Sequence, residues 1–260
     1  MDRPTPSDLA TRAIARVSPW AGMALYWRRQ SRFDPAMRAV DEIVAKGDVV
    51  VDMGAAYGLF TARFARLVGA TGHVHAFEPD PVKVRRLRSL RRRRDWITVH
   101  PSGLSDQPAQ DFLQVPIVNG RRLREQASVD ARAHAGTVAY ERVPIVLQRL
   151  DDVVSDERVS LIKCDVEGHE LPALRGADRL VHAARPRLLV EIEQRHHDSP
   201  ISLVFEALSD WGYDGYALRD EERVPLAEFD VERDQIKPLA GSRGGFPPEG
   251  YVNNFIFESI

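Results

Sequence analysis

The sequence has a single cysteine, Cys164, no long hydrophobic run and almost no net charge. One thiol cannot form an intrachain disulfide, which favours a reducing compartment, so we expect a cytoplasmic protein. The longest candidate membrane stretch, residues 17–27, is shorter than the roughly 20 residues that span a bilayer, so we expect no membrane segment. Lysine and arginine number 36 against 38 aspartates and glutamates, a formal charge of −2. This balance disfavours a dedicated nucleic-acid binder, which usually carries a strongly basic domain.

From residue 49 onward, short β-rich runs alternate with helical patterns, which is typical of βαβ units and a parallel sheet. The pattern predicts one α/β domain over residues 47–260. A helical segment over residues 1–46 precedes it, and whether this segment caps the site or forms a dimer contact stays open. The expected strands cover residues 49–51, 73–77, 96–100, 112–118, 142–147, 159–164, 187–192, 213–218 and 253–257. The polar stretch at residues 119–140 predicts a surface insertion that shapes a binding site.

The first expected strand runs into a turn that contains Gly54 and Gly58 and leads into a helix. Glycines let backbone approach a ligand where side chains would block it, although an ordinary strand-to-helix turn is the alternative. Acids end both of the first two strands, Asp52 the first and Glu78 the second. An acid at the second position can accept hydrogen bonds from ribose hydroxyls. The two acids together indicate a nucleoside-bearing cofactor.

The glycine spacing separates two classes of cofactor. A dinucleotide turn follows Gly-x-Gly-x-x-Gly and binds a pyrophosphate. Here three residues separate Gly54 from Gly58, and Asp52 precedes them, an anion that would repel pyrophosphate but could hold an ammonium group. S-adenosylmethionine offers an ammonium and no phosphate, and the segment resembles the first motif of methyltransferases that use it. An NAD(P)-dependent oxidoreductase is the alternative that the missing third glycine disfavours.

A second block of ionisable residues, Asp165, Glu167, His169 and Glu170, leaves the end of the strand at residues 159–164. Open α/β sheets bind ligands at this end of their strands, so the block suits acid–base chemistry. A solvated helix start is the alternative, because acids also suit the first turn of a helix.

In combination, these segments resemble the FkbM family of methyltransferases. The resemblance covers residues 48–193 and is carried by Asp-x-Gly-Ala-x-Tyr-Gly, Ala-Phe-Glu-Pro, and Lys-x-Asp-Val-Glu-Gly-His-Glu followed by Leu-Arg-Gly-Ala. Ala56 and Met53 depart from the family, which often has Asn at the first position and Ile or Val at the second. The resemblance implies an α/β fold of the Rossmann-like class I methyltransferase type, with a seven-stranded, mostly parallel sheet and helices on both faces. It also implies methyl transfer to a hydroxyl oxygen of a saccharide or polyketide.

The resemblance further implies which residues hold S-adenosylmethionine. Those implied to line its methionine end are Asp52, Gly54, Ala55, Tyr57 and Gly58. Those implied for its ribose and adenine are Glu78, Pro79, Ser102, Gly103 and Leu104, and Asp165 is expected to contact the cofactor as well.

Methyl transfer needs the acceptor oxygen, the methyl carbon and the sulfur in line, and a base that removes the hydroxyl proton adds a factor of about 10²–10⁴. His169 is our first candidate for the base, since an imidazole has an unperturbed pKa of about 6.5. A histidine that only packs or binds a neighbouring carboxylate is the alternative. Asp165 and Glu167 are the other candidate bases, or orient the imidazole.

Glu191 and Glu193 lie on one face of the strand at residues 187–192, and Glu193 is expected to join the catalytic group. Together with Asp165 they could bind a divalent cation such as Mg²⁺, which would lower the pKa of the acceptor hydroxyl. His196 and His197 are interpreted as a loop element, because a zinc site needs three or four ligands.

An arginine-rich run at residues 83–94 raises the alternative of an RNA methyltransferase. Its apolar residues recur at helical spacing, which favours a solvated face on a helix that packs against the sheet. We therefore expect a small-molecule hydroxyl acceptor and no nucleic acid as the partner, and a homodimer stays open.

Overall fold

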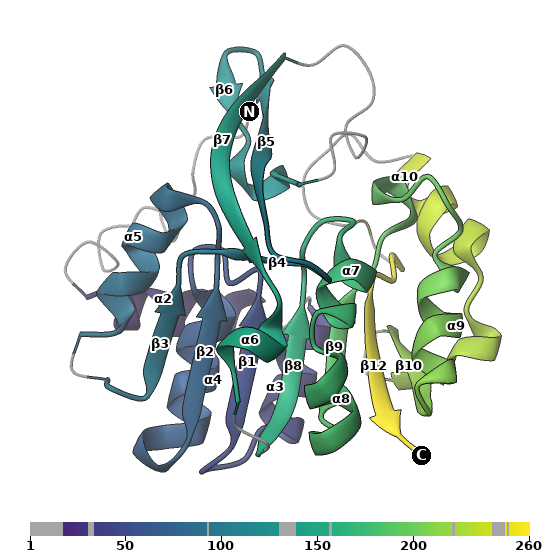
Figure 1. Cartoon of the computed structure of the whole chain (residues 1–260). Helices are drawn as coiled ribbons and strands as arrows, with labels where there is room; N and C mark the ends of the chain where they lie inside the picture. The colour runs from purple at the N-terminus through teal and green to yellow at the C-terminus, as the bar shows by residue number, and fades with distance from the viewer. Residues whose placement is uncertain are drawn as a thin grey trace.

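The computed structural model describes residues 18–30, 34–92, 94–129, 139–155, 158–219, 222–240, 248 and 250–260. In these ranges the chain forms a large sheet with helices on both faces and a smaller sheet that rises above the carboxyl ends of the parallel strands (Figure 1). Part of the predicted insertion, residues 130–138, lies outside the described residues.

The large sheet has eight strands within the described residues, in the order β11-β10-β12-β9-β8-β1-β2-β3. From one edge to the other these are β11 (Glu222–Pro225), β10 (Tyr213–Arg219), β12 (Asn254–Ser259), β9 (Arg187–Glu191), β8 (Val159–Cys164), β1 (Val49–Met53), β2 (His73–Phe77) and β3 (Ile97–His100). The strands from β9 to β3 are parallel, whereas β12 pairs antiparallel with both β9 and β10. The expectation of seven strands is one too few, because β11 adds an antiparallel strand at the edge.

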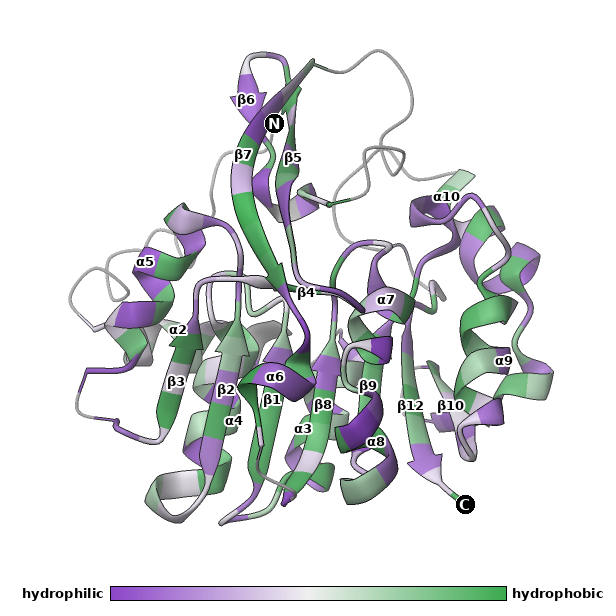
Figure 2. Cartoon of the chain, viewed as in Figure 1, coloured by the Kyte–Doolittle hydropathy of each residue, from purple (hydrophilic) through white to green (hydrophobic). Residues whose placement is uncertain are grey.

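The central strands are apolar throughout because both faces of the sheet are covered. Along β1, Val49, Val51 and Met53 pack into one hydrophobic cluster, and Val50 packs into the cluster on the opposite face. Successive side chains of a strand point to opposite faces of the sheet, so Asp52 lies on the same face as Val50, toward the helix that follows β1. Figure 2 shows this apolar interior as green strands in the middle of the large sheet.

Helices cover both faces of the large sheet, as the sequence predicts. One face carries α3 (Pro35–Ile43) and α4 (Leu59–Val68), with α5 (Pro81–Leu90) beside β3. The other face carries α6 (Leu150–Val153), α7 (Glu170–Arg175), α8 (Asp178–Ala184) and α9 (Ser202–Asp210), and the short α10 (Lys237–Ala240) lies near the end of the chain. Asp34 and Asp80 cap α3 and α5 by accepting hydrogen bonds from backbone N–H groups of the first turn, and a proline follows each cap.

The helix of the N-terminal segment, α2 (Pro19–Gln30), packs on α4 and α5 rather than on the sheet. The Trp27 ring meets Phe60 of α4 edge-on at 5.2 Å, and the guanidinium of Arg94 lies 3.4 Å from the centre of the Trp20 ring. Among the helices in the described ranges, none is both long and apolar enough to cross a membrane.

The two strands predicted at residues 112–118 and 142–147 leave the large sheet and form the smaller one. Its strands, in spatial order, are β4 (Gly103–Leu104), β7 (Ala139–Gln148), β5 (Ala109–Val118) and β6 (Arg121–Arg122). Two polar contacts fasten this small sheet to the large one. Arg124 binds both carboxylate oxygens of Asp80, at 2.8 and 2.7 Å, and the Ser128 hydroxyl donates to the backbone carbonyl of Glu167 at 2.7 Å.

Arg124→Ala is expected to destabilise the protein by about 3 kcal/mol, because it leaves the fully buried Asp80 carboxylate without its cation. Arg122→Ala is the matched control, since Arg122 pairs with Glu141 at the exposed surface and its loss should cost at most about 1 kcal/mol. Urea unfolding of both variants measures the difference. Equal losses would show that the Arg124 contact does not hold the small sheet in place.

Candidate active site

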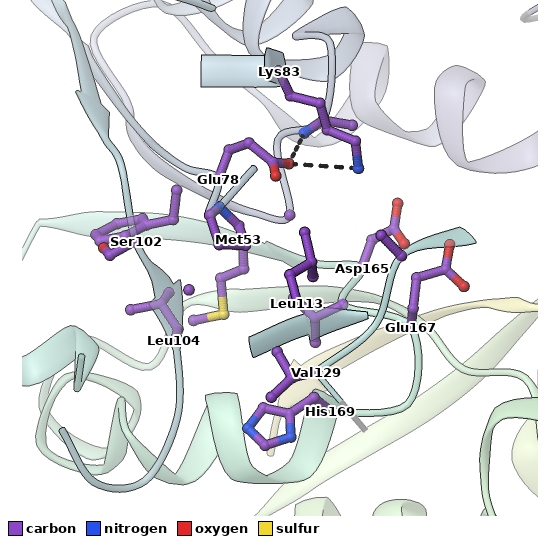
Figure 3. A pocket seen from close by; sticks show the side chains of 17 residues that line it. Met53, Glu78, Lys83, Ser102, Leu104, Leu113, Val129, Asp165, Glu167 and His169 are labelled. Atoms are coloured by element: carbon purple, nitrogen blue, oxygen red, sulfur yellow. Dashed lines mark hydrogen bonds and ion pairs between the residues drawn. The ribbon is translucent and has the colours of Figure 1, made fainter. Parts of the chain in front are cut away.

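A cavity lies at the carboxyl ends of β1, β2 and β8, beneath the small sheet (Figure 3). Gly54 and Ala56 line it after β1, Glu78 after β2, and Asp165 and Glu167 after β8. The apolar side chains that cover it from the small sheet and its loop are Leu113, Ala127 and Val129. The crevice predicted from the strand ends is therefore present, and the insertion closes it from above.

The two glycines of the first turn, Gly54 and Gly58, are required by different neighbours. Both have positive φ, +77° at Gly54 and +87° at Gly58. A Cβ on Gly54 would lie 1.8 Å from the backbone carbonyl oxygen of Asp165, so this glycine lets the turn pass the end of β8. A Cβ on Gly58 would lie 2.5 Å from Leu90 of α5. Gly58 thus permits helix packing, and it does not line the cavity as the resemblance implied.

Glu78 is a fixed acceptor at one end of the cavity. Its carboxylate oxygens accept hydrogen bonds from the backbone N–H groups of Ala56 and Asp80, both at 2.8 Å, and the Lys83 ammonium lies 4.0 Å away. Burial raises the pKa of Glu78, and Lys83 and the two N–H groups oppose that rise. A carboxylate oxygen carries two acceptor sites, so the held carboxylate keeps capacity for the hydroxyls of a ribose.

Asp52 is a buried carboxylate with one unpaired oxygen. Its Oδ2 accepts a hydrogen bond from the Thr61 hydroxyl at 2.6 Å, whereas Oδ1 has no partner among the described residues. Burial raises the pKa of Asp52, although Lys163 and Thr61 act against the rise. An unsatisfied buried acceptor is costly, and a ligand ammonium placed there would satisfy it.

Asp52 opens into a second pocket that continues from the first. The two share Gly54, Ala56 and Asp165. The second pocket is also lined by Ala55 and Tyr57, and by Met23 and Tyr26 of α2. The residues implied for the methionine end, apart from Gly58, therefore lie around this pocket, and α2 forms one wall of it.

Lys163 balances the acids at this junction. Its ammonium lies 2.9 Å from Asp165 Oδ2 and 4.6 Å from the centre of the Phe60 ring. Burial opposes its charge, but Asp165 and Asp52 outweigh burial and raise the pKa of Lys163. The lysine was part of the second sequence motif, but its role as the buried cation of the site was not predicted.

Ser102, Gly103 and Leu104 line the far part of the cavity, where the resemblance places adenine. His169 also lines the cavity, and its Nε2 lies 3.0 Å from the Ser105 hydroxyl. Figure 3 shows Glu78 at one end of the cavity and His169 at the other, with Leu113 and Val129 between them. His169 therefore lies beside Ser105, at the end of the cavity opposite Glu78.

The acids after β8 and β9 divide into two environments. Glu167 lines the cavity, and its Oε2 lies 3.0 Å from His196 Nδ1. Glu193 binds Arg195 and the Tyr251 hydroxyl; these partners overcome the effect of burial and lower its pKa. Glu193 is therefore a firmly held anion rather than a ready base.

Glu191 accepts a hydrogen bond from the Asn253 amide at 2.6 Å. Burial first, then the negative charges of Asp165 and Glu193, raise its pKa well above the usual range. Within the described residues no group of three or more His, Cys, Asp or Glu side chains could hold a metal ion, so the expected divalent cation is not supported. The reason is that Lys163, Asn253 and Arg195 bind the three carboxylates separately.

The family model described as the methyltransferase FkbM domain matches residues 52–214, and the chain belongs to this family. The fold is accordingly the Rossmann-like class I methyltransferase fold that the sequence predicts. No curated protein matches the chain closely enough to count as a relative.

Three solved structures illustrate the likeness. A methyltransferase FkbM from Methylobacillus flagellatus KT is 17% identical, with 95% of this chain and 58% of that chain covered and a TM-score of 0.49. A SAM-dependent methyltransferase from Aquifex aeolicus is 13% identical, with 89% and 92% covered and a TM-score of 0.46. Aeropyrum pernix fibrillarin in complex with S-adenosyl-L-methionine is 15% identical, with 83% and 68% covered and a TM-score of 0.46. The chain spans little more than half the length of the first of these.

Asp52→Asn is expected to raise the free energy of unfolding. The native pKa of Asp52 lies above its ordinary value of 3.8, so the folded protein opposes its ionisation. The gain should grow as pH rises above 3.8 and level off above the native pKa. Urea unfolding between about pH 5 and 8 measures it, with Asp41→Asn, in an exposed ion pair, as the control. A clear loss of stability in Asp52→Asn would mean that the folded protein favours the charge.

Proposed function

We propose that the protein transfers a methyl group from S-adenosylmethionine to a hydroxyl oxygen of a small acceptor, a saccharide or a polyketide-type metabolite. The observation that carries the proposal is the pair of buried carboxylates at the ends of β1 and β2. Glu78 suits the ribose hydroxyls, and the unpaired Oδ1 of Asp52 suits the ammonium of the methionine end. The family supports methyl transfer, and the choice of a hydroxyl acceptor rests on the sequence resemblance alone.

The described residues fit this cofactor along its length. Ser102 and Leu104 offer the adenine a partly polar, partly apolar wall, and Leu113 covers it from the small sheet. The junction at Gly54 and Asp165 connects the nucleoside cavity to the pocket beside Asp52. Since acids line both ends, the crevice favours a cation over a diphosphate, which argues against the oxidoreductase alternative.

When bound, the cofactor supplies a methyl group already activated by the positive sulfur, so the protein mainly has to position the acceptor and take its proton. We assign Glu167 as the base that takes the proton of the acceptor hydroxyl. Glu167 lines the cavity, and burial raises the pKa of its carboxyl toward the neutral range in which a base works best. His169 also lines the cavity, with the Ser105 hydroxyl at its Nε2, and remains the alternative base.

We propose a small molecule, and not RNA, as the acceptor. The arginines of the predicted basic helix, such as Arg85 and Arg88, are exposed on α5. The apolar residues Val84, Leu87 and Leu90 form the opposite, buried face of α5, so the arginines are the solvated face of an amphipathic helix.

S-adenosylhomocysteine is expected to bind the protein, and Glu78→Gln should weaken this binding by about 10- to 100-fold, the loss for hydrogen bonds to a charged group. Isothermal titration calorimetry measures both affinities. Glu258→Gln is the matched control, because Glu258 lies at the opposite end of the sheet in an exposed pair with Arg187. Heat with NAD and none with S-adenosylhomocysteine would contradict the proposal.

One member of a panel of glycosides and macrolides is expected to gain the mass of one methylene unit when incubated with the protein and S-adenosylmethionine. Glu167→Gln should lower this turnover by about 100-fold while it leaves the affinity for S-adenosylhomocysteine nearly unchanged. Mass spectrometry of the panel measures the transfer. Methylation of an amine-bearing member alone would contradict the hydroxyl acceptor.

A further inference from the structure

Glu167 is held in a costly backbone conformation. Its φ is +55°, in the left-handed region that residues with a Cβ rarely adopt, at a cost of about 1–3 kcal/mol. Such a conformation persists only where the surroundings fix it. The Ser128 hydroxyl donates to the Glu167 carbonyl at 2.7 Å, and the next residue, Gly168, also has positive φ and donates its N–H to Glu170 at 2.8 Å.

His196 reaches Glu167 from the neighbouring strand. It ends the short turn Gln194–His196 that follows β9, and its N–H donates to the Glu193 carbonyl at 2.9 Å. The ring is nearly buried, with 9% of the side chain exposed, and its Nδ1 lies 3.0 Å from Glu167 Oε2. A Cβ on Gly168 would lie 2.6 Å from the His196 carbonyl, so the two turns are in close backbone contact.

We propose that His196 is a positioning residue for methyl transfer, which holds the Glu167 carboxylate at the acceptor side of the cavity. The proposal rests on the proposed function, in which Glu167 takes the acceptor proton. In that step the O–H bond of the acceptor breaks and the proton passes to Glu167. The oxygen–methyl bond forms as the methyl–sulfur bond breaks with its electron pair left on sulfur, so a carboxylate and a sulfonium become a neutral acid and a neutral thioether.

The charges around the pair give His196 a second effect. Glu167 faces it from the turn after β8, Glu193 and Arg195 lie on its own turn, and Tyr251 binds Glu193 from the segment before β12. Burial lowers the pKa of His196, but Glu167 and Glu193 outweigh burial and raise it. Burial raises the pKa of Glu167, and His196 lowers it. Removal of the imidazole should therefore keep Glu167 protonated up to a higher pH.

The adjacent histidine provides a matched control. His197 Nε2 lies 2.9 Å from Glu170 Oε2, which places a second histidine from the same turn close to a buried acid, although neither atom makes a hydrogen bond among the described residues. Glu170 is buried and does not line the cavity. Loss of His197 therefore tests the structural role of such a contact without a change at Glu167.

The test compares wild type with His196→Ala, His196→Asn and His197→Ala by calorimetry from about pH 5 to 8, with S-adenosylmethionine and S-adenosylhomocysteine as the probes. An ionised Glu167 near the transfer point favours the sulfonium over the thioether by about fivefold. In His196→Ala the preference for S-adenosylmethionine over S-adenosylhomocysteine should fall near pH 5, where Glu167 stays protonated, and return near pH 8, where Glu167 is ionised. His196→Asn, whose amide can replace Nδ1–H, should restore it, and His197→Ala should leave it unchanged.

NMR of the ligand-free protein supplies a readout that needs no ligand. The His196 ring should titrate above the ordinary value of about 6.5, and Glu167→Gln should lower that midpoint. An unchanged midpoint, or a sulfonium preference that is the same in His196→Ala and wild type at every pH, would overturn the proposal. Failure of the wild type to bind either probe would instead overturn the proposed function.

Discussion

The site contains carboxylates buried at the ends of neighbouring parallel strands, and burial there costs free energy unless partners stabilise their charge. Asp52 and Glu78 are both almost inaccessible to water, and burial raises the pKa of each. Glu78 is stabilised by two backbone N–H groups and by Lys83, and Asp52 by Thr61 and Lys163. One oxygen of Asp52 stays unpaired among the described residues, so the free protein retains an unsatisfied acceptor where a cationic ligand would be stabilising.

The small sheet connects the two halves of this site. Its side chains cover the cavity that Glu78 and Glu167 line, Arg124 binds the cap of α5 beside Glu78, and the Ser128 hydroxyl binds the backbone carbonyl of Glu167. On the other side, α2 from the N-terminal segment forms a wall of the pocket beside Asp52. Elements outside the parallel sheet thus shape both ends of one crevice, while the sheet supplies the charged residues.

Much of the fold could be predicted from local sequence. The run of valines in β1 marks a strand buried on both faces, and Asp34 and Asp80 before prolines mark helix starts. The separate small sheet could not be predicted, because an alternating pattern shows that a strand exists but not which strand it pairs with. Gly58 shows the same limit, since only the fold reveals that it packs against Leu87 and Leu90 of α5 and is not among the residues that line the two pockets.

The residues that line the two pockets could be predicted in large part because they lie within short motifs, whereas the partners of the acids could not. Lys163 lies two residues before Asp165 in sequence but also balances Asp52 on the neighbouring strand, and His196 reaches Glu167 from the turn that follows β9. The sequence interpretation of His196 as a loop element correctly placed it in a turn and missed its contact. No local signal marks Tyr251 or Asn253 as partners of Glu193 and Glu191.

The central claim is that two buried acids hold opposite ends of a phosphate-free, positively charged nucleoside. Calorimetry with S-adenosylhomocysteine and adenosine on Asp52→Asn and Glu78→Gln tests it most directly. The account predicts that Asp52→Asn weakens the binding of S-adenosylhomocysteine by about tenfold or more and leaves the binding of adenosine unchanged. Glu78→Gln should weaken the binding of both ligands. Equal losses for both ligands in Asp52→Asn, or no loss for either, would contradict it.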